Sequence, residues 1–468
     1  MEPGYDAVFF SDPGERSYFD FWRILVGNIF LFPSEVMART LPQLARQEPA
    51  IKHAAIAMAA MARAIVPSVR KRTQKELYAN GPHYEFALKH YVQAIKLVRI
   101  SKPSSDNMLW AIVCCVLFVT FECLHGDRNA ALSHVDHAYK MMENYFKHRS
   151  MVEGTRGTDS IRAVCDDAAW VFHGMTIQSW SHSVLHSKDP SKISWCCRGH
   201  KRKFAIEEMP PAFSDVNAAR RWWRVVQHYT CHRCPIFTEM FAEGLSNESL
   251  VGSYIRPDLP PEHVEELQAV LPEFVGHVQR WLNGFQPIYD HAQAEKDVDL
   301  ASFIDACNLR QQYLTLWTEL ISLSHQDVVV MRTLTPSFRE MVHLSRIILE
   351  AQSNCGGCSE VFSMDNGPTW PLLQAACRCH DAKVRQDATE LLGKYHRRDG
   401  IWDSRAFHGL AVRCAEMEMG NAVSGGLIEQ WPMLKRHQAR VSSNGDVICG
   451  GKVMRWSPDT RQWQEIDN

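Results

Sequence analysis

Apolar residues recur every three or four positions through most of this chain, and this period constrains its fold more than any other feature. The clearest stripe runs through Tyr84, Ala87, Leu88, Tyr91, Ile95 and Val98. Charged residues such as Glu85 and Lys89 stand between the apolar ones. This spacing places the apolar side chains on one face of a helix and the charged side chains on the face toward water. The stripe predicts an amphipathic helix that packs on a larger helical core.

The same period predicts helices over most of the remaining sequence. One should begin at Pro49, a favourable first helical position, and end before Pro67, which cannot continue a helix. Further helices are expected near residues 107–124, 129–146, 163–186, 215–244, 261–285, 300–324, 336–352, 371–379, 382–395 and 404–419. The sequence therefore predicts an all-α fold.

The longest apolar run extends from Met108 to Phe121, and Glu122 closes it. A helix that crosses a membrane needs about 20 apolar residues, so this run is too short. We expect it to form a buried core helix, and we expect no membrane association.

The last residues of the chain follow a different pattern. From Gln438 the apolar period shortens toward two, and Asn444-Gly445 is a strong hairpin signal. Short strands are expected at residues 447–448, 453–456 and 462–466. The sequence predicts a helical domain over residues 1–437 and a small β-meander over residues 438–468. Trp456 and Trp463 should pack the meander on the helices.

Charge and cysteine content bear on two questions: whether the chain attracts nucleic acid, and in which redox compartment it resides. The formal net charge is -2, so no overall positive field attracts a polyanion. Basic runs at residues 70–75 and 198–203 are read as solvated faces, and either could also serve as a nuclear import signal. The 15 cysteines include Cys114-Cys115 inside the apolar run. We interpret them as free thiols in a reducing compartment, with no secretory signal and no disulfide framework.

Several segments resemble the fungal-specific transcription factor domain, which follows a zinc cluster in many fungal regulators. An early helix is similar at His83-Tyr84, Ala87-Leu88, Tyr91 and Ala94-Ile95. The next helix pair is similar at Leu117-Phe118-Val119, Phe121-Glu122, Gly126, Ala130-Ala131 and His134. Later segments are similar at Met209-Pro210, Phe213, Ala219-Arg220, 362–365, Pro371-Leu372, Cys377-Arg378, Arg385, Ala388, Leu391-Leu392 and 397–405.

The resemblance implies a helical effector domain that regulates transcription through other regulators, co-regulators or a small apolar ligand. It implies a nuclear location, with the cytoplasm left open, and leaves both homodimers and heterodimers open. No cofactor is expected. The family's zinc cluster has no counterpart ahead of Cys114. We therefore expect this chain alone not to bind DNA in a sequence-specific way.

The best metal candidate joins Cys355 and Cys358 with Cys377, Cys379 and His380. Two such pairs about 18 residues apart can complete a tetrahedral zinc site. However, the second group ends an apolar helix, and the family that the chain resembles needs no metal there. We expect no stoichiometric zinc in the purified protein. Cys231-His232-Arg233-Cys234 is a weaker candidate, read as a helix turn with two core thiols. Cys196-Cys197 is expected in a loop, where adjacent cysteines have a poor chelating geometry.

An enzyme is the alternative reading: an all-helical secondary-metabolite enzyme or metabolite-binding protein on a regulator-like scaffold. Asp166-Asp167 resembles the magnesium-binding carboxylates of terpene cyclases, but Trp170 stands where a further carboxylate is needed. His134, Asp136 and His137 could bring imidazoles near a carboxylate, although a packing role for His134 is favoured. We assign no catalytic, cofactor-binding or metal-binding residue. Structural roles are expected for Arg385, Trp402 and Arg405, with Trp402 buried.

Overall fold

The stripe that includes Tyr91 forms helix α6, Pro82–Ile100, in the computed structural model of this protein. Ala87, His90, Tyr91 and Ala94 are its buried residues. The structure describes residues 10, 13–28, 41–65, 81–101, 105–151, 168, 171, 172, 174, 175, 178, 206–233, 261–324, 332–353, 361–422, 439–441, 447–449, 452–457 and 462–466. Helices dominate these residues, which confirms the predicted all-α class.

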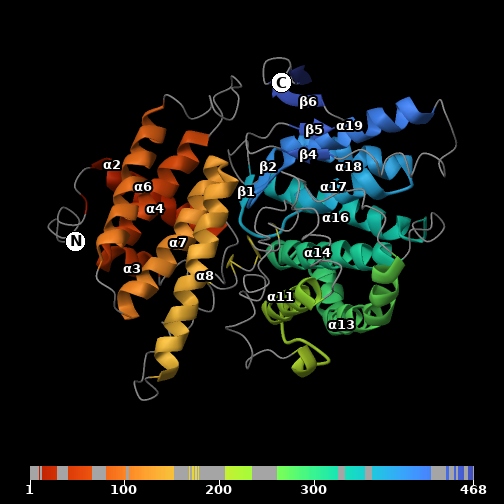
Figure 1. The fold of residues 1–468 in the computed structure, drawn as a ribbon, viewed down its shortest axis with the longest axis horizontal. Helices are drawn as coiled ribbons and strands as arrows, with labels where there is room; N and C mark the ends of the chain where they lie inside the picture. The colour runs from red at the N-terminus through yellow and green to blue at the C-terminus, as the bar shows by residue number, and fades with distance from the viewer. Residues whose placement is uncertain are drawn as a thin grey trace. The chain divides into compact units, whose positions relative to one another are not determined.

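The chain divides into two compact units (Figure 1). The first unit comprises Met1–Thr176 and Phe362–Asp365, and the second comprises Ile177–Val361 and Asn366–Asn468. The predicted boundary at residue 438, which separates helices from strands, is a different division and stays a prediction.

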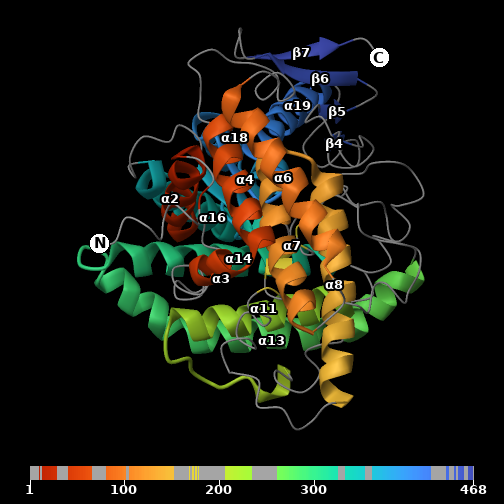
Figure 2. The same cartoon turned by 90° about the vertical axis from the view of Figure 1, so that its left-hand side faces the viewer.

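Helices α2, α3, α4, α6, α7 and α8 build the first unit, and α4, α6, α7 and α8 lie side by side (Figure 2). Their bounds, besides α6, are Pro13–Asn28, Leu41–Gln47, Pro49–Ile65, Ser105–His125 and Arg128–Met151. Helix α4 contacts α2, α3, α6 and α7, and every residue from Ala54 to Met61 is buried. Its alanines leave room for the neighbouring helices to approach closely.

Helix α7 contains the longest apolar run. Met108–His125 is long and apolar enough to cross a membrane, with a mean hydropathy of 2.1, but 83% of this window is buried inside the protein. Leu117 and Val119 have no exposed surface. The structure thus places this segment in the core of the first unit, as predicted.

Helices of the second unit pack on one another in chain order from α13 to α19 (Figure 1). The helical segments are η3 Ile206–Glu208, α11 Val216–Arg233, α13 Pro261–Ala294, α14 Leu300–Ser324, α16 Thr335–Ser353, α17 Thr369–Arg378, α18 Ala382–Lys394 and α19 Ser404–Ala422. Trp223 and Trp281 are fully buried, with ring centroids 4.6 Å apart. Phe285 stacks on Trp281 and extends this aromatic core.

Helix α13 is longer than the sequence indicates. The sequence predicts a helix over 261–285, but α13 continues to Ala294 with Pro272 and Pro287 inside it, although proline removes a backbone donor. Phe285 and Ala292 are buried on either side of Pro287. Their burial favours continuation of the helix past a residue that disfavours it.

The described residues also include two small sheets. The first has the order β1-β2-β3, with bounds Val361–Ser363, Arg397–Asp399 and Trp402–Asp403. Gly400, with φ 57°, makes the tight turn between β2 and β3. The sequence did not predict this sheet, because its strands are too short to show a period.

The second sheet is the predicted meander. Its strands β4 Ala439–Val441, β5 Val447–Cys449, β6 Lys452–Ser457 and β7 Gln462–Ile466 pair antiparallel in chain order. Strands β4, β5 and β6 contact α19, so the meander lies on a helix as expected. Trp456 and Trp463 occupy paired positions, but their side chains lie outside the described part of the structure.

Candidate functional site

A chain of hydrogen bonds joins three helices inside the first unit. Its members, which we call the Tyr91 network, are Tyr84, Tyr91, Glu122, His125 and His134. Tyr91 Oη donates to Glu122 Oε1 at 2.5 Å and lies 2.8 Å from His134 Nε2. His125 lies 3.3 Å from both Glu122 and Tyr84. The network therefore links α6, α7 and α8 through polar groups within an apolar bundle.

Hydrogen-bond directions show that Nε2 of His134 carries a proton. The single proton of the Tyr91 hydroxyl goes to Glu122, so His134 has to donate from Nε2 to the phenol oxygen. Burial lowers the pKa of His134, which favours the neutral imidazole. Burial and the Glu122 carboxylate raise the pKa of Tyr91, so the phenol stays protonated.

Aromatic packing holds Tyr91 in place. Its ring stacks on Phe121 at 4.1 Å between centroids and meets Phe118 edge-on at 5.3 Å. Tyr91, Phe118, Phe121, Glu122 and His134 all belong to the segments that resemble the fungal family. The structure thus gives these positions a shared role, because they hold three helices together.

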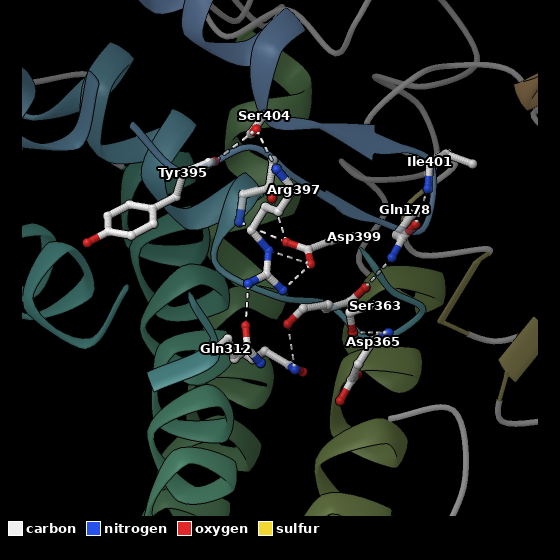
Figure 3. Close-up of polar contacts among 12 residues, drawn as sticks. Gln178, Gln312, Ser363, Asp365, Tyr395, Arg397, Asp399, Ile401 and Ser404 are labelled. Carbon is white, nitrogen blue, oxygen red and sulfur yellow. Dashed lines mark hydrogen bonds and ion pairs between the residues drawn. The ribbon is translucent and has the colours of Figure 1, made fainter. Parts of the chain in front are cut away.

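A second polar network lies in the second unit and centres on Asp399 (Figure 3). Asp399 Oδ1 accepts from Arg397 Nε at 2.9 Å and from Nη2 at 2.5 Å. Its other oxygen accepts from the backbone N–H of Thr369 at 3.0 Å and from the Thr369 hydroxyl at 2.5 Å. Asp399 therefore neutralises Arg397 and also caps the first turn of α17, where a negative charge is favourable.

Amides extend this network to other elements. Gln178 Nε2 donates to Asn366 Oδ1 at 3.0 Å, and Gln178 Oε1 accepts from the Ile401 N–H at 3.0 Å (Figure 3). Gln312 Nε2 donates to the Asn366 carbonyl at 2.9 Å. Gln178 and Gln312 are both buried. The two amides meet at Asn366, so together they connect α14 with the β2–β3 turn and satisfy buried polar groups on the way.

Another buried ion pair joins α14 and α17. Arg378 Nη1 lies 2.7 Å from Glu319 Oε1, and Gln374 donates to the same carboxylate. In these networks each ionisable group is bound by residues from neighbouring elements. Such an arrangement ties the elements of the second unit to one another.

The sequence-based metal candidates are only partly described. Cys377 is half-buried and Cys379 is buried, whereas Cys355 and Cys358 lie outside the described residues. Burial raises the pKa of the Cys379 thiol and lowers that of His380. Positions also outside the described part are Cys196, Cys197, Cys234, Asp166, Asp167, Trp170 and the two basic runs, and the side chains of Cys231 and His232 in α11 are likewise not described.

His134, Asp136 and His137 do not come together. His134 contacts Tyr91, whereas Asp136 forms an ion pair with Lys140 at 2.6 Å and His137 is exposed.

The predicted burial of Trp402 is confirmed. Its side chain is 3% exposed and stacks on Trp370. Arg385 donates to the carbonyls of Cys379 and His380, at 2.7 and 3.1 Å, just after α17 ends. The Arg405 N–H donates to Asp403 at the start of α19.

Sequence reasoning did not identify the two networks. Glu122 and Arg397 appeared only as motif positions, and their partners come from distant segments. The sequence offered one sign of the first network: Glu122 is a carboxylate directly after a long apolar run, where burial of its side chain could be expected.

One comparison with known protein families gave a match, and the matched residues lie mostly in the first unit. The family model described as the fungal specific transcription factor domain matches residues 18–193, a range that includes the Tyr91 network. The later segments that resemble the same family lie beyond this range. No curated protein and no solved structure matches the chain. Residues 18–193 are therefore similar to the fungal specific transcription factor domain.

Proposed function

We propose that this chain regulates transcription through its helical effector domain, by binding other regulators, co-regulators or a small apolar ligand. The family match over residues 18–193 is the observation that carries this proposal. Several of the residues that create the resemblance, among them Tyr91, Phe121 and Glu122, are buried in the helical bundle. Its place of action would be the nucleus.

The chain would depend on another protein to reach its genes. Specific recognition of DNA needs side chains at base edges and enough positive charge to hold the phosphates. A net charge of -2 gives no overall attraction to DNA. The buried carboxylates Glu122, Glu319 and Asp399 are bound to neighbouring helices or strands, which favours a rigid scaffold over an acid–base centre.

The test is a reporter assay in a fungal host. The full chain is fused to an unrelated DNA-binding domain, and reporter expression is compared with that of the DNA-binding domain alone. We expect the fusion to raise or lower expression. Met58→Asp, which places a charge at a fully buried position of α4, should abolish the effect.

Immunoblotting of each fusion gives the amount of protein, and a second control, Val298→Ala, changes an 84% exposed residue and should keep the effect. A well-expressed wild-type fusion that leaves the reporter at the level of the DNA-binding domain alone would show that the chain is no effector.

A further inference from the structure

Three helices of the first unit bring together Glu15, His53 and His90. Glu15 lies in the first turn of α2, His53 in α4 and His90 in α6. One ligand atom from each residue lies within 4.8 Å of the other two. Glu15 and His90 are each 3% exposed, and His53 is half-buried. The cluster is therefore nearly enclosed, with access at His53.

His90 occupies the centre of this cluster. Its Nδ1 lies 2.8 Å from Nδ1 of His53, and its Nε2 lies 4.0 Å from Glu15 Oε1. Phe86 stacks on the imidazole with centroids 4.5 Å apart, which fixes the ring plane. Lys52 Nζ lies 3.6 Å from Oε2, the other oxygen of Glu15. Lysine thus faces one oxygen of the carboxylate, and the histidine faces the other.

Two imidazoles and one carboxylate are a donor set that zinc accepts in proteins. Bonds of about 2.1 Å place the ligands of a tetrahedral ion ~3.4 Å apart. His90 faces His53 with Nδ1 and Glu15 with Nε2, and it can offer only one of these nitrogens to an ion. One ligand atom from each of the three residues lies within 4.8 Å of the others, so side-chain rotations that shorten these separations would bring the three atoms around one ion. A tetrahedral ion with three protein ligands also keeps one position for water.

The surroundings favour a neutral imidazole at His53, the form that binds a metal. Burial is the main cause that lowers the pKa of His53, Lys52 lowers it further, and the Glu15 carboxylate opposes the shift. Helix packing alone accounts for the hydrogen bond between the two histidines. Glu15 is itself paired with Lys52, so the observation that favours a metal is the convergence of one carboxylate and two imidazoles from three helices.

We propose that Glu15, His53 and His90 bind one Zn²⁺ ion that ties α2 to α4 and α6. The site departs from the sequence-based expectation of no stoichiometric zinc. Sequence spacing does not reveal it, because its ligands come from three separate helices. The proposal is independent of the regulatory function, since it concerns the assembly of the first unit.

The experiment uses the full chain, stripped of metal with a chelator and then titrated with Co²⁺ and with Zn²⁺. Cobalt in a site of nitrogen and oxygen donors gives visible absorption without the near-ultraviolet band of cobalt bound to thiolates. We expect one Co²⁺ ion per chain with this signature and its displacement by Zn²⁺. His53→Ala and Glu15→Gln should each weaken binding at least tenfold.

The matched control is His137→Ala, which removes an exposed histidine from α8 in the same unit and should leave binding unchanged. Circular dichroism shows whether each variant folds. If Glu15→Gln does not fold, the result with His53→Ala decides, because His53 is only half-buried and its replacement should disturb the fold less. Three results would overturn the proposal: no saturable Co²⁺ binding, equal binding by folded His53→Ala, or a thiolate band that disappears in Cys355→Ser/Cys358→Ser. The last result would assign the metal to the cysteine-rich segment instead.

Discussion

Arg397 and Asp399 lie two residues apart on the short strand β2 and form an ion pair that is almost completely buried. Alternate residues of a strand point to the same face, which brings the two side chains together. Arg397 is 2% exposed, and Asp399 has no exposed surface. Because Asp399 also accepts two hydrogen bonds from Thr369, the pair joins the strand to the start of α17.

Asp399→Asn should strongly destabilise the second unit. The substitution keeps the shape of the side chain but leaves the Arg397 guanidinium buried without its counter-charge. Removal of one member of a buried pair costs about 3–5 kcal/mol. Chemical denaturation followed by circular dichroism measures this loss. Asp387→Asn, which breaks the exposed pair with Lys383, should change the free energy of unfolding very little. Equal effects of the two substitutions would contradict the argument.

Trp402→Ala should also reduce stability. Trp402 is buried and stacks on Trp370 with centroids 5.3 Å apart. Truncation of a large aromatic side chain in a core costs about 3–5 kcal/mol. Thermal and chemical unfolding measure the change, with Val298→Ala as a control at an exposed position. An unchanged melting temperature together with lost activity would mean that Trp402 acts in function instead.

Stability should fall as the solution becomes mildly acidic. Burial lowers the pKa of His134 below its ordinary value of 6.5, so the unfolded chain binds a proton more readily than the folded chain. The free energy of unfolding is therefore unaffected by this group at higher pH and decreases as pH falls through 6.5 toward the folded-state pKa. His53 and His408 shift in the same direction. Denaturation curves across this range give the slope.

His134→Gln tests the assignment of that slope. Glutamine can still donate to Tyr91 but does not titrate, so the loss of stability on acidification should be smaller. The cost of the substitution itself appears at alkaline pH, where the imidazole is neutral in both states. An identical slope in the variant and the wild type would exclude His134 as a source.

Buried thiols should resist alkylation in the folded protein. Burial raises the pKa of Cys115 to about 12 and that of Cys307 to about 12, so both remain thiols and lack the reactive thiolate. Mass spectrometry after iodoacetamide treatment should find them unmodified until denaturant is added. The half-buried Cys377 provides an internal reference that should react sooner. Rapid labelling of Cys115 in the native protein would disagree with its enclosed position in α7.

The purified chain should show no base preference in DNA. Selection from randomised duplex DNA at physiological salt should enrich no sequence, because the chain has no overall positive charge and its family match lies in the helical domain. Enrichment of one sequence, with affinity well above that for bulk DNA, would refute this expectation.

Helical periodicity predicted much of the fold, because amphipathic stripes are local. The helix expected over 300–324 is α14 itself, and the helix expected from Pro49 ends at Ile65. Periodicity missed α2 and α3 near the start of the chain, and it ended α13 too early at Pro287. In α13, contacts made by residues on both sides of the proline outweigh its local preference.

The polar sites were beyond sequence reasoning for a different reason. The side chains of the Tyr91 network meet because three helices pack in one particular register. That register depends on contacts between helices and cannot be read from a single sequence. Glu15 meets His53 and His90 in the same way. Their residue types were visible, but their partners depend on contacts between helices.

Helix α4 is fully buried from Ala54 to Met61, and this has a consequence for shortened forms of the protein. A transcript that lacks residues 49–65 would not yield a smaller bundle, because α2, α3, α6 and α7 all share α4 as a neighbour. Their inner faces would be exposed together in such a product. Such a product should therefore fail to form the first unit at all, so this unit has no stable form smaller than the one that contains α4.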